Sequence, residues 1–138
     1  MYLEHLNLVV SDLDATLKFY GAAFPHWYIR GQGHQLWHGT PRNWVHFGDE
    51  THYLTFNDSG RGENRSLTSN QLGLAHFAFV TDNIEALSQR LLQAGFPIHN
   101  QGAATQYRKN VYFLDPDGFE LEFVQYLSDI PAERNQYL

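Results

Sequence analysis

Two similar seven-residue segments, with apolar residues at matching positions, occur in the chain 71 positions apart. Residues 3–9 align without a gap with residues 74–80, and each segment has a histidine at its third position, His5 and His76. In each segment, apolar residues alternate with polar ones or follow one another over the length of a strand. After each segment, apolar residues recur at the spacing of a helix. The repeat therefore predicts two copies of one supersecondary unit.

The first predicted helix begins after Ser11 and ends before Pro25, and the second begins after Asp82 and stops at Gly95. Residues 31–42 are expected to form a long loop. Further strands are expected at 27–30, 44–47 and 51–57 in the first half, and at 97–99, 110–114 and 119–126 in the second.

Each half is then βαβββ, and the expected fold class is α+β, with both modules forming one curled mixed sheet around a cleft. We expect a single domain over residues 1–138. Its first module spans about 1–57, a polar linker rich in Gly, Ser and Asn about 58–71, the second module about 72–127, and a tail 128–138.

Strand alternation gives the three principal strands one large apolar face each. The opposite faces carry His5, His76 and Glu122. Taken singly, each of these side chains is more simply explained as a solvent-exposed residue. Two histidines at equivalent repeat positions, together with a glutamate on a similarly patterned strand, favour a shared metal site if the sheet curls around that face.

Composition narrows the possible partners. The chain has 138 residues, 43% of them hydrophobic and 15% aromatic, which favours a sheet and a pocket for flat or apolar groups. It has no cysteine, so disulfides and zinc–thiolate sites are excluded. The net charge of −6 and the lack of a basic stripe argue against nucleic acid or an anionic membrane as a partner. Neither a signal sequence nor a bilayer-length apolar run is present, so a cytoplasmic protein is expected.

Four stretches resemble the vicinal-oxygen-chelate superfamily, which includes glyoxalase I, bleomycin-resistance proteins, extradiol dioxygenases and fosfomycin-resistance proteins. They are His5-x-x-x-x-Val10-x-Asp12-Leu13, Phe19-Tyr20, His76-Phe77-Ala78-Phe79 and Tyr112-Phe113-x-Asp115-Pro116-Asp117-Gly118-x-x-x-Glu122. With the repeat, the resemblance covers at least residues 2–126.

The resemblance implies one divalent metal ion held by His5, His76 and Glu122. Whether the ion is Fe, Mn, Ni, Zn or Co stays open, as does a fourth protein ligand. It also implies that Glu122 and Tyr112 act in catalysis and that a small substrate with adjacent oxygens is bound. The lining positions implied for this substrate are Asn7, Tyr53 and Asn110.

Several functions fit this pattern, and the sequence leaves them open. Metal-dependent lyase or isomerase chemistry as in glyoxalase I is weakened by Tyr53, which stands where that enzyme has a glutamate. Extradiol dioxygenase chemistry fits three ligands, but no histidine occurs at 102–104, where an acid–base histidine is expected.

The two alternatives are a fosfomycin-resistance-type thiol transferase and a non-catalytic, bleomycin-resistance-like binding protein. The first has only Arg108 and Lys109 as nearby cations. The second would use aromatic side chains to line a cleft: Trp27, Trp37, Trp44 and Tyr53. Short members of the superfamily commonly dimerise, so a homodimer is expected, with the metal site inside one chain or shared between two.

Overall fold

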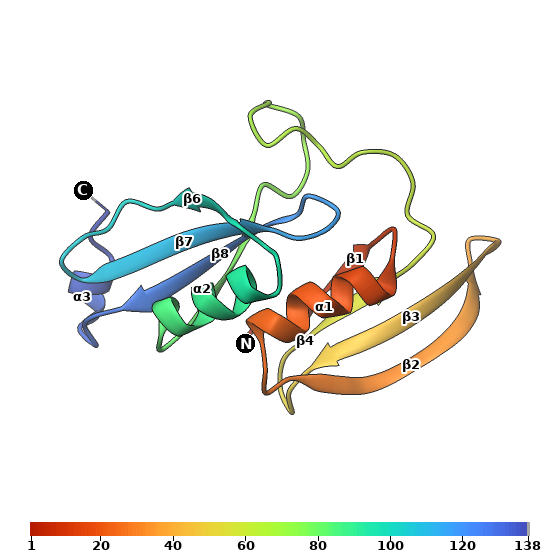
Figure 1. The fold of residues 1–138 in the computed structure, drawn as a ribbon, viewed down its shortest axis with the longest axis horizontal. Helices are drawn as coiled ribbons and strands as arrows, with labels where there is room; N and C mark the ends of the chain where they lie inside the picture. The colour runs from red at the N-terminus through yellow and green to blue at the C-terminus, as the bar shows by residue number, and fades with distance from the viewer. Residues whose placement is uncertain (138) are drawn as a thin grey trace. The chain divides into compact units, whose positions relative to one another are not determined.

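The computed structural model describes residues 1–137 and divides into two compact units. Unit 1 is Met1–Glu63, and unit 2 begins at Asn64. Figure 1 shows that each unit combines one longer helix with a four-stranded sheet. This arrangement confirms the predicted α+β fold of two βαβββ modules.

Unit 1 forms a mixed sheet in the order β1-β4-β3-β2. Its first strand pairs in parallel with β4, and the other neighbours are antiparallel. The elements are β1 (His5–Val9), α1 (Leu13–Ala23), β2 (Tyr28–Trp37), β3 (Thr40–Gly48) and β4 (Tyr53–Asn57).

Unit 2 repeats this topology with the order β5-β8-β7-β6. Its first strand, β5, also pairs in parallel with its last strand, β8, and a short helix follows β8 in the chain. The elements are β5 (Phe77–Val80), α2 (Ile84–Gln93), β6 (Ile98–Gln101), β7 (Arg108–Leu114), β8 (Glu120–Tyr126) and α3 (Pro131–Arg134).

Both longer helices begin one residue later than the sequence predicts. The N-caps are Asp12 and Asn83, not Ser11 and Asp82. Asp12 Oδ1 accepts from the amide of Ala15 at 3.0 Å, and Asn83 Oδ1 accepts from the corresponding amide of α2 at 2.9 Å. These carboxylate and amide oxygens satisfy amides that have no partner within the helix.

The prediction of a loop over residues 31–42 is wrong. That stretch is the distal part of a β2–β3 hairpin, closed by His38 and Gly39. Both turn residues have positive φ, 49° and 78°, as a two-residue hairpin with the twist of its strands requires. The two glycines of β2 concealed the strand because glycine weakens β propensity.

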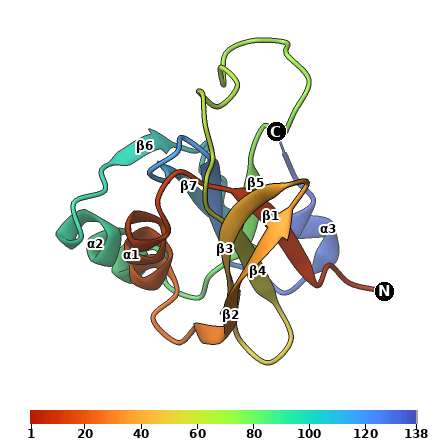
Figure 2. The same cartoon turned by 90° about the vertical axis from the view of Figure 1, so that its right-hand side faces the viewer.

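One face of each sheet is covered by the unit's own helix, and the opposite face is called the open face below. Figure 2 shows α1 on one side of the unit 1 sheet. Tyr20 of α1 packs on Phe56 of β4 with ring centroids 4.7 Å apart. Fully buried side chains of the helices and strands that form the cores of the two units include Phe19, Tyr20, Leu54, Phe56, Leu91, Phe113, Leu121 and Phe123. Because strand side chains alternate, the polar residues of the same strands lie on the open faces.

Among residues 1–137, no helix has the length and apolar character needed to cross a bilayer.

Candidate functional site

Two of the three predicted metal ligands meet on the open face of unit 2. His76 directly precedes β5, and its Nε2 atom lies 3.3 Å from Oε2 of Glu122 on β8. The imidazole is 42% exposed, whereas the Glu122 side chain is 12% exposed. Parallel pairing of β5 with β8 places these side chains together although they are far apart in sequence.

Glu122 is held by a neighbouring strand. Asn110 of β7 donates from Nδ2 to Glu122 Oε1 at 2.8 Å and contacts the Tyr112 hydroxyl at 3.3 Å. Burial, followed by the negative charge of Glu122 and hydrogen bonding to it, raises the pKa of Tyr112. The phenol therefore stays protonated at neutral pH and can donate a hydrogen bond.

A second carboxylate lies on the other side of the His76 ring. Glu120 Oε1 is 3.7 Å from His76 Nδ1, and Glu120 Oε2 is 3.5 Å from His99 Nε2. The pairing of β6 with β7 shifts register between Ile98 and Asn100, so His99 stands at a bulge. Bulges reorient side chains next to functional sites, and this one brings His99 to Glu120.

The His76–Glu122 pair fits a divalent ion. Two donors at about 2.1 Å from one ion, with bond angles between octahedral and tetrahedral, lie roughly 3.0–3.4 Å apart. The observed 3.3 Å between His76 Nε2 and Glu122 Oε2 is within this range. Within residues 1–137, no three His, Asp or Glu side chains gather closely enough to form a complete metal site. The role of His5 as third ligand stays a prediction.

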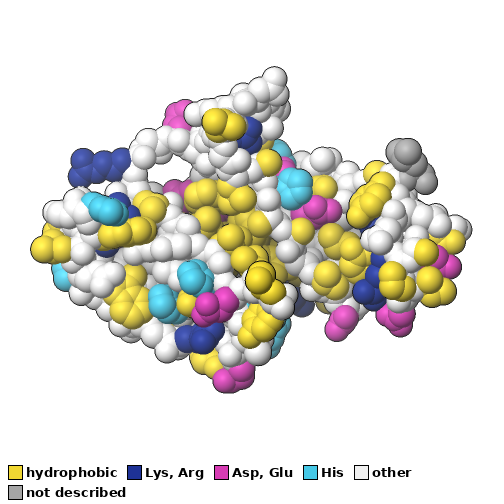
Figure 3. Space-filling model, turned by 180° about the vertical axis from the view of Figure 1, so that it is seen from behind, with side chains coloured by type: hydrophobic (Ala, Val, Ile, Leu, Met, Phe, Trp, Pro, Cys, Tyr) yellow, Lys and Arg dark blue, Asp and Glu magenta, His cyan; other side chains and the backbone are white. Residues whose placement is uncertain are grey.

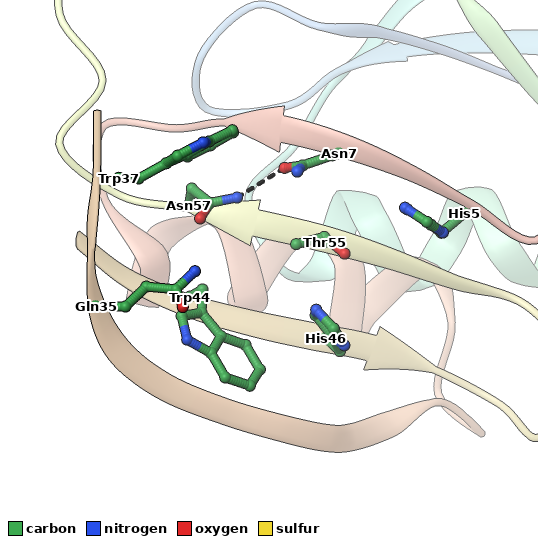
Figure 4. A pocket seen from close by; sticks show the side chains of 8 residues that line it. All are labelled: His5, Asn7, Gln35, Trp37, Trp44, His46, Thr55 and Asn57. Carbon is green, nitrogen blue, oxygen red and sulfur yellow. Dashed lines mark hydrogen bonds between the residues drawn. The ribbon is translucent and has the colours of Figure 1, made fainter.

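His5 lies on the open face of unit 1, at a cavity of about 340 Å³ shown in Figure 4. Its side chain is 41% exposed, its Nδ1 atom is 3.5 Å from Glu4, and its ring stacks on Tyr53 at 4.8 Å. Several other histidine side chains also reach the surface (Figure 3). The cavity is lined by His5, Asn7, Gln35, Trp37, Trp44, His46, Thr55 and Asn57.

Asn7 and Tyr53, two of the predicted substrate contacts, lie on the same open face as His5. Asn7 Oδ1 accepts from Asn57 Nδ2 at 2.7 Å and lines the cavity. Tyr53 stacks beside His5 and lies 4.9 Å from the ring of His46, with the Arg30 guanidinium 4.4 Å from its own ring centre. Its ring is therefore already enclosed by neighbours.

Two further histidines of unit 1 have different surroundings. His46 is half-buried in β3 and lines the cavity, a position that the sequence analysis did not identify. Its alternation with the apolar pair Val45 and Phe47 was the signal for an open-face position. His52 is exposed in the turn after Asp49, whose carboxylate accepts a hydrogen bond from its amide.

Of the aromatic side chains predicted to line a cleft, Trp37 and Trp44 do line the cavity of unit 1. Trp27 is half-buried and does not line the cavity; its ring centroid is 4.0 Å from Phe24 and 5.8 Å from Phe47.

A family model described as the Glyoxalase/Bleomycin resistance protein/Dioxygenase superfamily matches residues 2–123. Among curated proteins, the glutathione transferase FosA of Serratia marcescens is 31% identical over 122 residues, which is 87% of this chain and 77% of that protein.

Solved structures show the same fold. A glyoxylase/bleomycin resistance protein/dioxygenase domain from Frankia sp. EAN1pec superimposes with a TM-score of 0.74 and 20% identity, covering 94% of this chain and 95% of that one. The fosfomycin resistance protein FosX of Listeria monocytogenes superimposes with a TM-score of 0.71 and 18% identity, covering 96% and 97%.

Proposed function

Because the chain belongs to the Glyoxalase/Bleomycin resistance protein/Dioxygenase superfamily, we propose that it is a metal-dependent enzyme for a small substrate with two adjacent oxygens. The observation that carries the proposal is the 3.3 Å separation of His76 Nε2 and Glu122 Oε2 on the open face of unit 2. An imidazole nitrogen beside a buried carboxylate oxygen is a donor set that suits Fe, Mn, Ni, Zn or Co.

In this proposal His76 and Glu122 hold the ion, and His5 supplies the third ligand from the same chain or from a second copy. A bound divalent ion would supply Lewis-acid polarisation of the substrate oxygens. Asn110 fixes one oxygen of Glu122 and leaves the other directed at His76. Tyr112, protonated at neutral pH, donates to a substrate oxygen.

A second candidate is glutathione transfer, favoured by the 31% identity with the glutathione transferase FosA. The extradiol and glyoxalase types of reaction remain the other options for the same donor set. Neither Asn110 nor Tyr112 distinguishes them, because each can serve any substrate whose oxygens approach Glu122.

The metal site is tested first without substrate. Protein stripped with a chelator is titrated with each of the five ions by calorimetry, and the loaded protein is checked by elemental analysis. His76→Ala and Glu122→Gln are expected to lower affinity for the preferred ion by about tenfold or more. Exposed His26→Ala is the matched control for loss of an imidazole. Unchanged affinity in both ligand variants would overturn the site.

His5→Ala is measured in the same way, and a loss comparable to that of His76→Ala supports the third ligand. The loaded protein is then assayed with a hemithioacetal, with catechol under oxygen, and with fosfomycin plus glutathione. Turnover of one of them that disappears in His76→Ala identifies the reaction class.

A further inference from the structure

Two indole side chains form part of the cavity wall in unit 1, and each packs against other residues of the β2–β3 hairpin. The Trp44 ring lies across Gly31 and Gly33 of the paired strand: a Cβ built on Gly33 would be 2.9 Å from two ring atoms. The Trp37 ring carries the guanidinium of Arg42 at 4.5 Å from its centre. Both indoles also line the cavity, as Figure 4 shows.

The position of the Trp44 ring depends on the absence of a side chain at residue 33. Contacts of 2.9 Å are shorter than a Cβ tolerates, so only glycine lets the indole lie flat on β2 at this point. A Cβ on Gly31 would stand 3.7 Å from the same ring, which is ordinary van der Waals contact. Gly33 therefore creates a flat aromatic surface, and Gly31 only borders it.

Polar side chains line the cavity beside the two indoles (Figure 4). One hydrogen bond joins Asn57 Nδ2 to Asn7 Oδ1 at 2.7 Å. It uses one group of each amide and leaves the Asn7 amino group and the Asn57 carbonyl oxygen to contact a ligand. Gln35 and Thr55 also line the cavity.

No Lys, Arg, Asp or Glu occurs among the described residues that line this cavity. Burial is the largest cause of a lowered pKa at His46, so its ring is uncharged at neutral pH. Proteins bind phosphate-like and carboxylate groups with Arg, Lys or converging backbone amides. The lining instead offers neutral hydrogen-bonding groups and aromatic faces.

We propose that this cavity binds one uncharged planar ring that carries hydroxyl or carbonyl groups, stacked on Trp44 and hydrogen-bonded by the Asn7–Asn57 pair. A cavity of about 340 Å³ is at the small end of ligand pockets, which suits a single ring. The inference names the substrate class of the proposed function. It rests on that function only in taking the ligand to be the substrate, because His5 lies on the same wall.

The test uses chelator-treated, metal-free protein, so that binding at the cavity is separated from binding to a metal. Catechol is titrated while the three indole N–H signals are followed by NMR, each assigned with a Trp→Phe variant. The Trp44 and Trp37 signals are expected to move, and the signal of Trp27, which does not line the cavity, is expected to stay. The comparison ligands are trans-1,2-cyclohexanediol, which keeps the adjacent oxygens but is not planar, and methylphosphonate, which is anionic.

Catechol is expected to bind about tenfold more tightly than cyclohexanediol, since only a planar ring gains the stacking contact. Gly33→Ala is expected to weaken catechol binding about tenfold by displacing the indole, and Gly31→Ala to leave it unchanged. Trp44→Leu provides a second variant if Gly33→Ala does not fold.

Equal affinity for catechol and cyclohexanediol, tighter binding of methylphosphonate, movement of the Trp27 signal alone, or no binding would each overturn the inference. Binding of catechol to a protein that takes up no metal would uphold the inference and contradict the proposed function. Metal uptake without catechol binding would support the proposed metal site and overturn the inference.

Discussion

Asn110 on β7 donates a hydrogen bond from its side-chain Nδ2 to Oε1 of Glu122 on the neighbouring strand β8, at 2.8 Å. Both residues are buried to about nine tenths, so the contact is protected from water. It occupies Glu122 Oε1 and leaves Oε2 at 3.3 Å from His76 Nε2. The amide therefore determines which carboxylate oxygen is offered to a metal ion.

Replacement of Asn110 by alanine tests this role. Without the amide, the Glu122 carboxylate loses its anchor, and affinity for the preferred ion should fall by about tenfold to a hundredfold, as for other partners of metal ligands. Calorimetric titration of the stripped protein measures the change. Asn100→Ala, an exposed position on neighbouring β6, is the control and should leave affinity unchanged.

Glu120 is predicted to orient the imidazole of His76. Its Oε1 atom is 3.7 Å from Nδ1, the ring nitrogen that does not face Glu122. A carboxylate at that nitrogen fixes the tautomer that leaves Nε2 free to bind a metal. Glu120→Gln should lower metal affinity about tenfold and alter the 15N signals that report the His76 tautomer. Exposed Glu85→Gln is the control; the same result in both variants would remove this role from Glu120.

Stability at low pH should depend on Asp49. Hydrogen bonds from the backbone amides of His52 and Thr51 lower the pKa of its carboxyl from 3.8 to about 2. Because the folded-state pKa is the lower one, the ionised carboxylate stabilises the fold above about pH 3.8. That contribution is lost as the pH falls toward 2.

Urea unfolding of the wild type and Asp49→Asn from pH 7 to pH 2 checks the prediction. The difference in midpoint should be largest above pH 4 and shrink toward pH 2. Exposed Glu63→Gln should show no such trend. A difference for Asp49→Asn that is the same at every pH would contradict the assignment.

The core of unit 2 should be sensitive at Phe123. Its ring is fully buried on β8, with centroids 6.2 Å from Phe113 and 6.4 Å from Phe79. Truncation to alanine leaves a cavity and should lower the free energy of unfolding by about 3–5 kcal/mol, measured by chemical denaturation. Leu72→Ala, at a residue 98% exposed, should have little effect.

Most of the fold could be predicted from the sequence, because the repeated segments and the alternation of side chains along strands are both visible within short stretches of the chain. The faces predicted for His5 and Glu122 are correct, since each follows from the buried neighbours on its own strand. The distal β2–β3 hairpin was missed because Gly31 and Gly33 are poor strand formers on their own. They are compensated by the Trp44 ring, a contact across strands that no local pattern contains.

The candidate site was less accessible to prediction. That His76 approaches Glu122 was expected from the repeat, but the contact of His99 with Glu120 depends on a bulge, which shifts the alternation by one residue. His46 was missed for a different reason: it has no partner in the repeat, and the resemblance assigned it no role.

The contact between Gly33 and Trp44 also constrains how the chain can change over evolutionary time. A side chain at position 33 would force the indole at position 44 to move from its place on β2. Relatives with a Cβ at the first position should therefore carry a smaller residue at the second. Positions 33 and 44 are expected to change together in evolution, and the shape of the ligand that the cavity binds is expected to change with them.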